Sequence, residues 1–357
     1  MNKKICFICL GNLFLTPYIN KYIKSIECDY DIIFWNRYGI NELSNAKKQY
    51  SYNFSVAENS SKLKKLHGYI SFANYARKII IENKYDGIIL TPTNIGMILS
   101  STLRKYYKGK YIIDIRDYTM EKNILYYKLE KILLDHAAYN VISSEGYKQF
   151  LPKGNYIVVH NKSEVPIETI NTFRFREKKN KKLILTNIGL IRFHDQNKKI
   201  IDIFSNDNRF EIRFIGADAL SLKDYCNQKK AENIVLLDRF PPENTFDLLK
   251  NTDIILNLYG NNTPVLDYAL SNKLYFASQL GLPILVCPNT FMERLSKEYG
   301  FGFSFELEDI ESKDKLLNWY KLIDWKEFYE GCNRFLNKVK KEDEIFDEII
   351  KKFVIQI

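Results

Sequence analysis

The sequence predicts an α/β protein made of two Rossmann-like domains that face each other across a cleft. Three observations lead to this fold class. The chain has 357 residues, which is too long for one ordinary hydrophobic core and suits two domains. Short apolar runs of strand length alternate with helical segments in the first half of the chain. The alternation stops over a charged segment without a strand pattern, residues 165–182, and then starts again.

Apolar runs of strand length occur in the first half at residues 4–10, 31–35, 87–92, 111–115, 140–144 and 156–160. Apolar strands that are separated by crossover helices form parallel sheets covered on both faces. One of these helices is predicted to begin with Thr16 as its N-cap and Pro17 at its first position, where proline is well tolerated.

The second half repeats the pattern, with strands expected at residues 183–189, 211–216, 233–238, 253–259, 283–287 and 302–306. We therefore expect an N-terminal domain over residues 1–164, a linker over 165–182 and a second domain over 183–312. A helical tail follows over residues 313–357, and its C-terminal helix is expected to pack back on the first domain. Neither half carries a GxGxxG sequence, which disfavours a dinucleotide cofactor.

Basic residues exceed acidic ones only in the first half of the chain. Residues 1–165 hold 24 Lys and Arg against 14 Asp and Glu, whereas residues 166–357 hold 29 of each kind. Such a half can face nucleic acid, an anionic membrane surface or an anionic substrate, or it can be a solvated lysine-rich surface. No apolar run approaches the roughly 20 residues of a membrane span, so a cytoplasmic location is expected.

Residues 259–286 carry the signals of a phosphate-binding site. The apolar run before them ends at Gly260 and leads into a polar loop. Two helix starts are open after that loop, Thr263 with Pro264 as one and Ser271 as the other. Either start points free backbone N–H groups at the carboxyl edge of a sheet, where phosphate groups bind.

Four segments, in order along the chain, resemble motifs of GT-B glycosyltransferases. They are DIRDY (114–118), NVISSEGYKQFL (140–151), GLIRFHDQNKK (189–199) and LSNKLYFASQLGLPILV (270–286). They are similar to the family's D-x-R-D loop, its strand–Ser–helix, its Gly-x-x-Arg…Lys loop and its N-K-L…G-x-P-V signature. The chain most resembles the enzymes that assemble capsules and other polysaccharides, which are related to the large retaining GT-B family. The resemblance implies an N-terminal acceptor domain and a C-terminal domain for a nucleotide-sugar donor.

The resemblance assigns the donor diphosphate to two cations in one loop and to the N-K pair. Arg192 and Lys198 would hold the diphosphate, with Lys199 as a substitute for Lys198, and they would stabilise the charge that develops on the leaving nucleotide. Asn272 and Lys273 are expected beside it at a helix start. Further donor contacts are expected from Gly216, Phe240, Asn262, Thr263 and His194. The alternative for each is a polar or turn residue without a ligand.

Two positions depart from the family's pattern. Retaining relatives carry a Glu-x7-Glu pair, whereas this chain has Tyr268 and Phe276 at those positions. Neither side chain accepts hydrogen bonds as a carboxylate does. Asp267, one residue away, is the candidate replacement for the first Glu. Galactofuranosyltransferase-like enzymes also carry the N-K-L signature without the second Glu, so activity is compatible with the departure.

Candidate catalytic carboxylates on the acceptor side are Asp114 and Asp117. In an inverting enzyme one of them deprotonates the acceptor hydroxyl, and Asp117 is the first choice because it lies in the loop. Alternatively, Asp114 and Arg116 form a structural pair. Gly11 and Asn12, which follow the first strand, are expected in the acceptor-side loop.

These observations predict a glycosyltransferase of capsule, exopolysaccharide or O-antigen synthesis. Its acceptor would be a polyprenyl-diphosphate-linked saccharide at the cytoplasmic face of the cell membrane, which suits a basic first domain. No cofactor or metal is expected, because GT-B enzymes generally need no bound metal and the sheet-edge loops hold no Asp-x-Asp. One alternative is a catalytically inactive GT-B homologue that assists a partner transferase. A nucleic-acid binder is the other, but no recognition motif for nucleic acid is visible.

Overall fold

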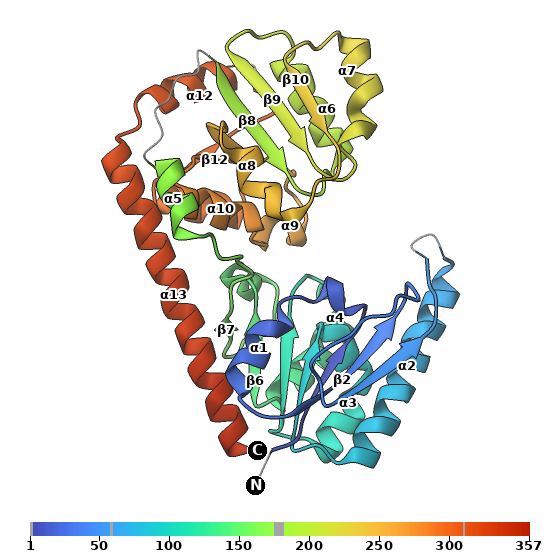
Figure 1. The fold of residues 1–357 in the computed structure, drawn as a ribbon. Coiled ribbons are helices and arrows are strands. Elements are labelled where there is room, and N and C mark those ends of the chain that lie inside the picture. The colour runs from blue at the N-terminus through green and yellow to red at the C-terminus, as the bar shows by residue number, and fades with distance from the viewer. Residues whose placement is uncertain (1–2, 58–59, 175–181, 310) are drawn as a thin grey trace. The chain divides into compact units, whose positions relative to one another are not determined.

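The computed structural model describes residues 3–57, 60–174, 182–309 and 311–357 and shows two compact α/β units (Figure 1). The first unit consists of residues 1–161 together with residues 341–357, and the second consists of residues 162–340. Within the described ranges, no helix is both long enough and apolar enough to cross a membrane. Each unit has its own parallel sheet, which confirms the predicted fold class of two Rossmann-like domains.

The first unit is built on a seven-stranded parallel sheet with the strand order β3-β2-β1-β4-β5-β6-β7. Every residue of β1, β4 and β5 is buried, as expected for central strands that are covered on both faces. The strands are β1 (Ile5–Cys9), β2 (Tyr30–Asn36), β3 (Lys48–Asn53), β4 (Gly87–Thr91), β5 (Tyr111–Ile115), β6 (Tyr139–Ile142) and β7 (Ile157–Val158).

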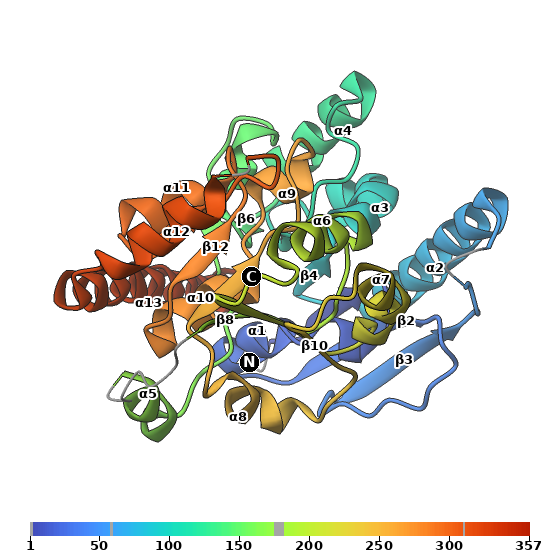
Figure 2. The ribbon, with the colours of Figure 1, turned by 90° about the horizontal axis from the view of Figure 1, so that it is seen from above.

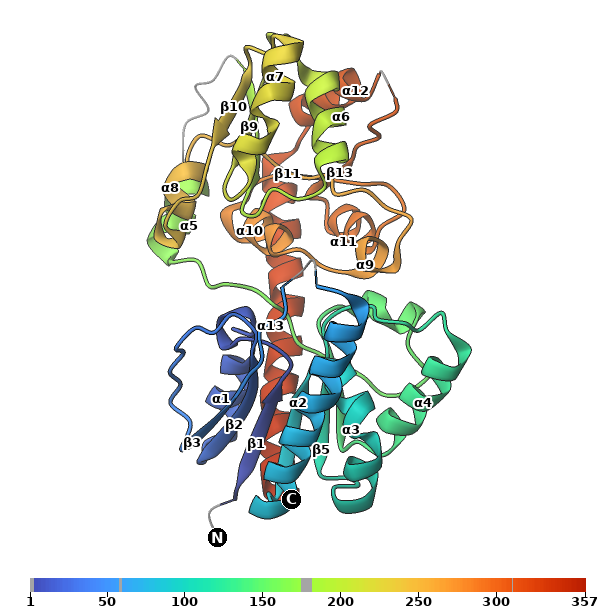
Figure 3. The same cartoon turned by 90° about the vertical axis from the view of Figure 1, so that its right-hand side faces the viewer.

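Helices cover both faces of this sheet. On one face pack α1 (Ile19–Ile26) and the last turns of α13 (Trp325–Gln356), where Tyr22 and Phe346 meet edge to face with ring centroids 4.8 Å apart. On the other face lie α2 (Lys62–Asn83), α3 (Thr93–Tyr106) and α4 (Ile124–Asp135) (Figure 3). There Trp35 of β2 stacks on Phe72 of α2. The unit also contains the short 3-10 turns η1 (Leu13–Leu15) and η2 (Glu145–Gln149).

Two details of the first unit differ from the sequence prediction. Strand β3 was not predicted, because it is an edge strand of mostly polar, partly exposed residues and lacks an apolar run. Helix α1 begins at Ile19, and Thr16 is not its N-cap. The hydroxyl of Thr16 instead donates to the carbonyl of Leu13 at 3.1 Å and closes the η1 turn.

The second unit is built on a six-stranded parallel sheet with the order β10-β9-β8-β11-β12-β13. Two hydrophobic clusters pack on it, one holding Tyr275 and Phe301 and the other holding Phe204 and Leu316. Its strands are β8 (Leu183–Ile188), β9 (Phe210–Ile215), β10 (Ile234–Leu237), β11 (Ile254–Asn257), β12 (Ile284–Val286) and β13 (Gly302–Ser304). Its helices and turns are α5 (Ile167–Arg174), α6 (His194–Phe204), η3 (Ala219–Leu222), α7 (Lys223–Lys229), η4 (Pro242–Asn244), α8 (Thr245–Leu249), α9 (Pro264–Tyr268), α10 (Asn272–Leu280), α11 (Phe291–Glu298), α12 (Ser312–Lys321) and the first part of α13.

The segment for which a linker is predicted, residues 165–182, contains helix α5. Val165 and Phe173 are buried in the core of the second unit. Just before them, the carbonyl of Ser163 accepts a hydrogen bond from the side chain of Gln279 at 3.0 Å. Residues 175–181 of the predicted linker lie outside the described residues. The observed contacts therefore begin the second unit near Lys162.

Helix α13 contributes to both hydrophobic cores. Phe328 and Phe335 are buried in the second unit, whereas Phe346, Ile350 and Phe353 are buried in the first. The apolar residues recur at helical spacing in both parts, so one continuous helix presents an apolar stripe to two different partners. The core of the first unit is therefore completed by residues that follow the whole second unit in the sequence.

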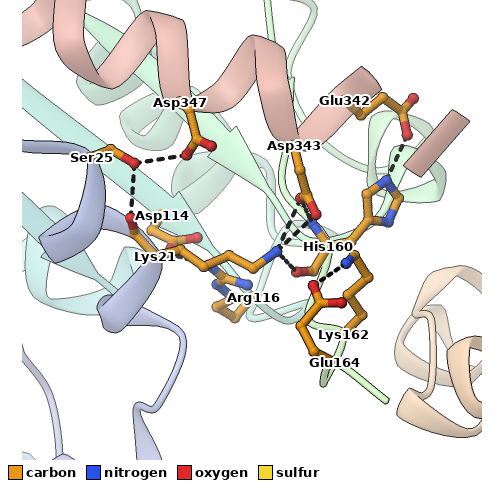
Figure 4. Close-up of polar contacts among 10 residues, drawn as sticks. All are labelled: Lys21, Ser25, Asp114, Arg116, His160, Lys162, Glu164, Glu342, Asp343 and Asp347. Carbon is orange, nitrogen blue, oxygen red and sulfur yellow. Dashed lines mark hydrogen bonds and ion pairs between the residues drawn. The ribbon is translucent and has the colours of Figure 1, made fainter. Parts of the chain in front are cut away.

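Polar contacts fix the later part of α13 on the first unit (Figure 4). Nζ of Lys21 lies 3.0 Å from Oδ1 of Asp343 and also donates to the carbonyl of His160. Nε2 of His160 lies 2.6 Å from Oε2 of Glu342. Since both residues 160 and 342 lie next to the points where the chain passes between the units, these bonds hold the two connections side by side within the first unit.

Helix α4 turns a carboxyl group toward the protein interior. Glu130 is fully buried, and neither of its carboxyl oxygens has a hydrogen-bond partner among the described residues. Burial, with a smaller contribution from nearby Glu121, raises the pKa of Glu130 to about 8. The carboxyl group is therefore mostly protonated in the folded protein at neutral pH, whereas it is ionised in the unfolded chain.

The variant Glu130→Gln is expected to remove a pH-dependent loss of stability. The pKa of Glu130 is higher in the folded protein than in the unfolded chain. As the pH rises toward 8, Glu130 therefore ionises in the unfolded chain while it is still protonated in the folded protein. This difference favours the unfolded chain, so the free energy of unfolding of the wild type falls. Between pH 5 and pH 8 the wild type should lose on the order of 3 kcal/mol relative to the variant. Chemical denaturation across this range measures the difference, with exposed Glu82→Gln as the control. A wild-type and variant difference that stays constant with pH would contradict the raised pKa.

Candidate functional site

A pocket of about 400 Å³ lies at the carboxyl edge of the second unit's sheet. Strand β8 pairs with β9 on one side and with β11 on the other. The chain therefore leaves β8 toward one edge of the sheet and later returns to its other side. In doubly wound sheets, ligands bind in the crevice at the point where the strand order reverses. The residues around this pocket follow β8, β11 and β12 or begin helix α10.

Lys273 of α10 lines this pocket and is only 4% exposed. Its Nζ donates to Oδ1 of Asn187 and, at 2.6 Å, to the hydroxyl of Tyr259, whose ring centroid lies 4.6 Å away. Both partners are neutral, and no carboxylate among the described residues pairs with this ammonium group. A buried cation without a counter-ion is costly. The pocket is therefore prepared for an anion.

Both helix starts that the sequence offers are used. Thr263 caps α9, and Ser271 caps α10 by accepting the N–H of Lys273 at 3.2 Å. The start of α10 lines the pocket through Ser271, Asn272 and Lys273, and the start of α9 lines it through the apolar Val265 and Leu266. The N-terminus of α10 thus adds its partial positive charge to the charge of the Lys273 ammonium.

The loop after β8 brings a second cation and an aromatic wall to the same pocket. Arg192 lines the pocket and is exposed, and its carbonyl accepts a hydrogen bond from the side chain of Asn197 at 2.7 Å. Phe193, with a φ of 60°, packs against Tyr259 with ring centroids 5.0 Å apart. Two cations beside an aromatic pair suit a ligand that joins phosphate groups to a flat or apolar group.

Lys198, the other predicted diphosphate ligand, lies outside this pocket lining. It is exposed on α6, and its ammonium group lies 5.5 Å from the ring centroid of Tyr225. Its proposed substitute, Lys199, forms an ion pair with Glu308 at 2.7 Å. The structure therefore brings Arg192 and Lys273 to one pocket but directs both lysines of α6 elsewhere.

His194 is also engaged away from the pocket. Its Nε2 lies 2.8 Å from a carboxylate oxygen of Asp218, and its Nδ1 lies 3.4 Å from the hydroxyl of Ser221. These contacts join the start of α6 to the turn after β9. A donor contact by His194 stays a prediction.

Gly216 supports the pocket from behind. Its φ is +134°, and a Cβ atom there would lie 1.8 Å from the carbonyl oxygen of Gly189. Glycine is therefore required for the close approach of the turns after β8 and β9. Phe240 is half-buried and packs against the hydrophobic cluster that contains Tyr275. Gly189 lines the pocket, whereas Gly216 and Phe240 lie outside its lining.

Asp267 holds the loop between β11 and α9. Its Oδ1 accepts the backbone N–H of Asn262 at 2.8 Å, and Asn262 has a φ of 67°. The side chain of Asn262 donates to Asn261 at 2.7 Å. Asp267, Asn262 and Thr263 lie beside the pocket but not in its lining. Their contact with a donor stays a prediction.

None of the residues described for the pocket lining is acidic. Phe276, which is at the position expected for the second Glu of the retaining enzymes that the sequence resembles, lines the pocket and packs edge to face on Phe246 with ring centroids 5.8 Å apart. Cys287 also lines it, but burial raises the pKa of its thiol to about 11. The thiol therefore stays protonated at neutral pH and is a poor nucleophile.

In the first unit, Asp114 of β5 and Arg116, the first residue after this strand, form a buried pair. Oδ2 of Asp114 lies 2.7 Å from Nη2 of Arg116, and the guanidinium carbon lies 4.1 Å from the ring centroid of Tyr18. Asp114 has no exposed surface, and burial raises its pKa although Arg116 opposes this shift. These contacts favour the structural alternative for Asp114. Asp117 is exposed beyond the strand and remains the candidate base.

Asn12 is fully buried and ties together two loops of the first unit. Its amide donates to Asn36 at 2.9 Å and to Glu42 at 2.6 Å, while its oxygen accepts the N–H of Arg37 at 2.9 Å. Gly11 beside it is also buried. The side chain of Asn12 therefore positions the loops after β1 and β2. In the described ranges, no group of three or more His, Cys, Asp or Glu could hold a metal ion.

Sequence reasoning missed the two residues that hold Lys273. Tyr259 is expected only as the residue at which a strand ends and the phosphate-binding segment begins, without a role for its hydroxyl. Asn187 is the amide that interrupts the apolar run over residues 183–189, and this polar residue near the carboxyl end of a buried strand was the available signal. Phe193 gave no signal, because its position depends on a positive φ.

Two doubly wound units that share the final helix define the GT-B fold. The chain is similar to sucrose-phosphate synthase from Thermosynechococcus elongatus, with a TM-score of 0.67 and 8% identity over 99% of this chain and 97% of that one. It is similar to HepE from Anabaena in complex with UDP, with a TM-score of 0.66 and 11% identity over 98% and 100% of the two chains. It is also similar to the lipopolysaccharide outer core galactosyltransferase WaaB, with a TM-score of 0.66 and 15% identity over 97% of this chain and 99% of that one.

Proteins with similar structures also include enzymes that catalyse a different reaction, epimerisation. The UDP-GlcNAc 2-epimerase from Neisseria meningitidis, bound to UDP-GlcNAc, matches with a TM-score of 0.56 and 14% identity over 98% of this chain and 100% of that one. No protein-family model and no curated protein sequence matches the chain. At these identities the likeness establishes the fold, and the reaction has to be argued from the pocket.

Proposed function

We propose that this protein is a glycosyltransferase that moves a sugar from a nucleotide-sugar donor to a polyprenyl-diphosphate-linked saccharide, in capsule, exopolysaccharide or O-antigen synthesis. The observation that carries the donor part is the buried ammonium of Lys273, which has only neutral partners and lines the pocket where the strand order reverses. The UDP and UDP-GlcNAc bound by two structures of the same fold support a nucleotide sugar as the ligand.

In this proposal the pocket stabilises the leaving nucleotide. Lys273, Arg192 and the start of α10 hold the two phosphates. Transfer of the sugar adds negative charge to the bridging oxygen, so cations that are fixed beforehand bind the transition state more tightly than the donor. Arg192 grips two oxygens in its fork, and Lys273 acts as a point charge. Phe193 and Tyr259 flank the same ligand.

Asp117 of the first unit is the proposed general base if the reaction inverts the sugar. If the reaction retains the anomeric configuration of the sugar, Asp267 is the proposed carboxylate nearest the donor. Its hydrogen bond with the backbone N–H of Asn262 would then have to be released. No resident cofactor has a part in either route. The acceptor would be met at the cytoplasmic face of the cell membrane, which agrees with the excess of basic residues in residues 1–165.

A donor panel tests the proposal. Purified protein is mixed with UDP-, GDP- and CMP-linked sugars and a polyprenyl-diphosphate saccharide, and both nucleotide release and the extended lipid are measured. We expect one nucleotide class to be released in step with the lipid product. Release without an acceptor product would instead indicate hydrolysis. The absence of turnover with every donor would contradict the proposal that the protein is an enzyme.

An inactive homologue that assists a partner transferase is the second candidate. The observation that favours it is the lining without an acidic residue, with Phe276 where relatives carry Glu. This candidate predicts nucleotide binding without turnover, together with a stable complex with an active transferase. Titration of the nucleotide and co-purification separate the two candidates.

A further inference from the structure

Helix α4 of the first unit presents large apolar side chains to solvent. Leu125, Leu129 and Ile132 follow one another at spacings of four and three residues, which places them on one face of the helix. Ile124 at the first position of the helix and Met120 in the turn before it are exposed as well. The exposed fractions are 54% for Met120, 68% for Ile124, 65% for Leu125, 48% for Leu129 and 37% for Ile132.

Helix α4 is apolar on its outward face as well as on its buried side, where Leu133 and Leu134 pack. Glu130 is fully buried, whereas Leu125 and Leu129 are exposed. Lys122 and Lys128 are exposed beside the apolar face, and no acidic residue in the described chain pairs with either of them. Lys131 is exposed as well and pairs with Asp135 at 2.8 Å. The outward face is therefore an apolar stripe bordered by cations.

Helix α2 repeats this arrangement at the same edge of the sheet. Its first turns expose Leu63 at 79%, Leu66 at 55% and Ile70 at 48%, with exposed Lys62 and Lys64 beside them. Because α2 follows β3 and α4 follows β5 in a parallel sheet, both helices begin at its carboxyl edge. Figures 2 and 3 show α3 between them.

We propose that the outward face of α4 docks the first unit on an anionic lipid bilayer, with its apolar side chains at the boundary between headgroups and acyl chains. Helices that lie in this boundary combine an apolar face with flanking lysines, which bind lipid phosphates. A second copy of the chain is disfavoured as the occupant, because pairing two such faces brings unpaired lysines together. The proposal deepens the membrane side of the proposed function, but docking itself does not depend on sugar transfer.

Flotation of the full-length protein with vesicles tests the proposal. The protein should float with vesicles that contain phosphatidylglycerol and stay unbound with purely zwitterionic vesicles. The double variant Leu125→Glu/Leu129→Glu should lower binding about tenfold or more, since it removes two apolar anchors and adds negative charge. The variant Lys122→Glu/Lys128→Glu should weaken binding in the same direction. Leu322→Glu, at a site of the second unit that is 83% exposed, is the control and should bind as the wild type does.

Thermal unfolding and nucleotide titration accompany the assay and show that each variant is folded. Unchanged vesicle binding by the folded leucine variant would overturn the proposal. A variant that changed only the oligomeric state, measured by light scattering, would overturn it in favour of a second copy. Nucleotide binding and donor turnover report on the pocket of the second unit, so a failure of docking and a failure of the proposed function are seen separately.

Discussion

The variants Lys273→Ala and Lys273→Met are expected to weaken nucleoside diphosphate binding about 10- to 100-fold. The expected size follows from the loss of a charge-assisted contact between a phosphate and an ammonium group that is almost fully buried. The loss should be the same for the nucleotide with and without its sugar, because Lys273 is assigned to the diphosphate. Isothermal titration with UDP and GDP measures the effect.

Stability should change little in these variants. Methionine has a volume similar to that of lysine, and its introduction removes a buried charge whose partners are neutral. The oxygen of Asn187 loses its donor, which opposes the gain. We therefore expect the free energy of unfolding to stay within about 2 kcal/mol of the wild type.

Two lysines of α6 provide matched controls for this experiment. Lys199→Met removes a lysine that pairs with Glu308, outside the pocket lining, and should leave nucleotide affinity unchanged. Lys198→Met tests the assignment that the family resemblance makes, and from its position over Tyr225 we expect a smaller loss than for Lys273. Wild-type affinity in folded Lys273→Met would remove the main support for the donor pocket.

The variant Arg116→Met is expected to destabilise the protein by about 3–5 kcal/mol, because it leaves the carboxylate of Asp114 buried without its cation. Asp114 has no exposed surface, and its Oδ2 is the partner of Arg116 at 2.7 Å. The double variant Asp114→Asn/Arg116→Met should recover a large part of this loss. Urea denaturation of the wild type, the two single variants and the double variant gives the coupling energy.

The loss in Arg116→Met should also depend on pH. Burial already raises the pKa of Asp114, and Arg116 opposes that rise, so the pKa should be higher in the variant. A carboxyl group with a raised folded pKa costs stability above its unfolded pKa and costs nothing once it is protonated in both states. The difference from the wild type should therefore shrink as the pH falls toward 4. Exposed Arg104→Met is the control, and purely additive losses in the cycle would contradict the buried pair.

The strands could be predicted because most of them are buried apolar runs. The central strands β1, β4 and β5 have no exposed residue, and two covered faces require continuous apolar sequence. Edge strand β3 has mostly polar, partly exposed residues and needs no continuous apolar sequence, so it could not be predicted in this way. Helix starts were predicted where a hydroxyl residue caps them, as at Thr263 and Ser271, but Thr16 bonds backward to Leu13. A local sequence cannot show which of two local partners a hydroxyl will choose.

Arg192, Asn272 and Lys273 were named from the sequence and line one pocket, whereas the other expected donor residues lie outside its lining. Lys273 lies at a helix start that faces the sheet edge, so its sequence position already places its charge. Lys198 lies one turn into α6, where a rotation of the helix decides between the pocket and Tyr225. The same limit applies to Asn12, whose amide is fully engaged by neighbouring loops.

Helix α13 has a consequence for how the chain matures during synthesis. The first unit is synthesised first, yet Phe346, Ile350 and Phe353 of its core emerge only after the entire second unit. Until then the face of its sheet that carries Phe7 and Ile32 lacks part of its cover. Domains usually fold as they leave the ribosome, beginning with the N-terminal one. Here the second unit is expected to reach its native state first, and the first unit is expected to complete its core only after Phe353 has left the ribosome.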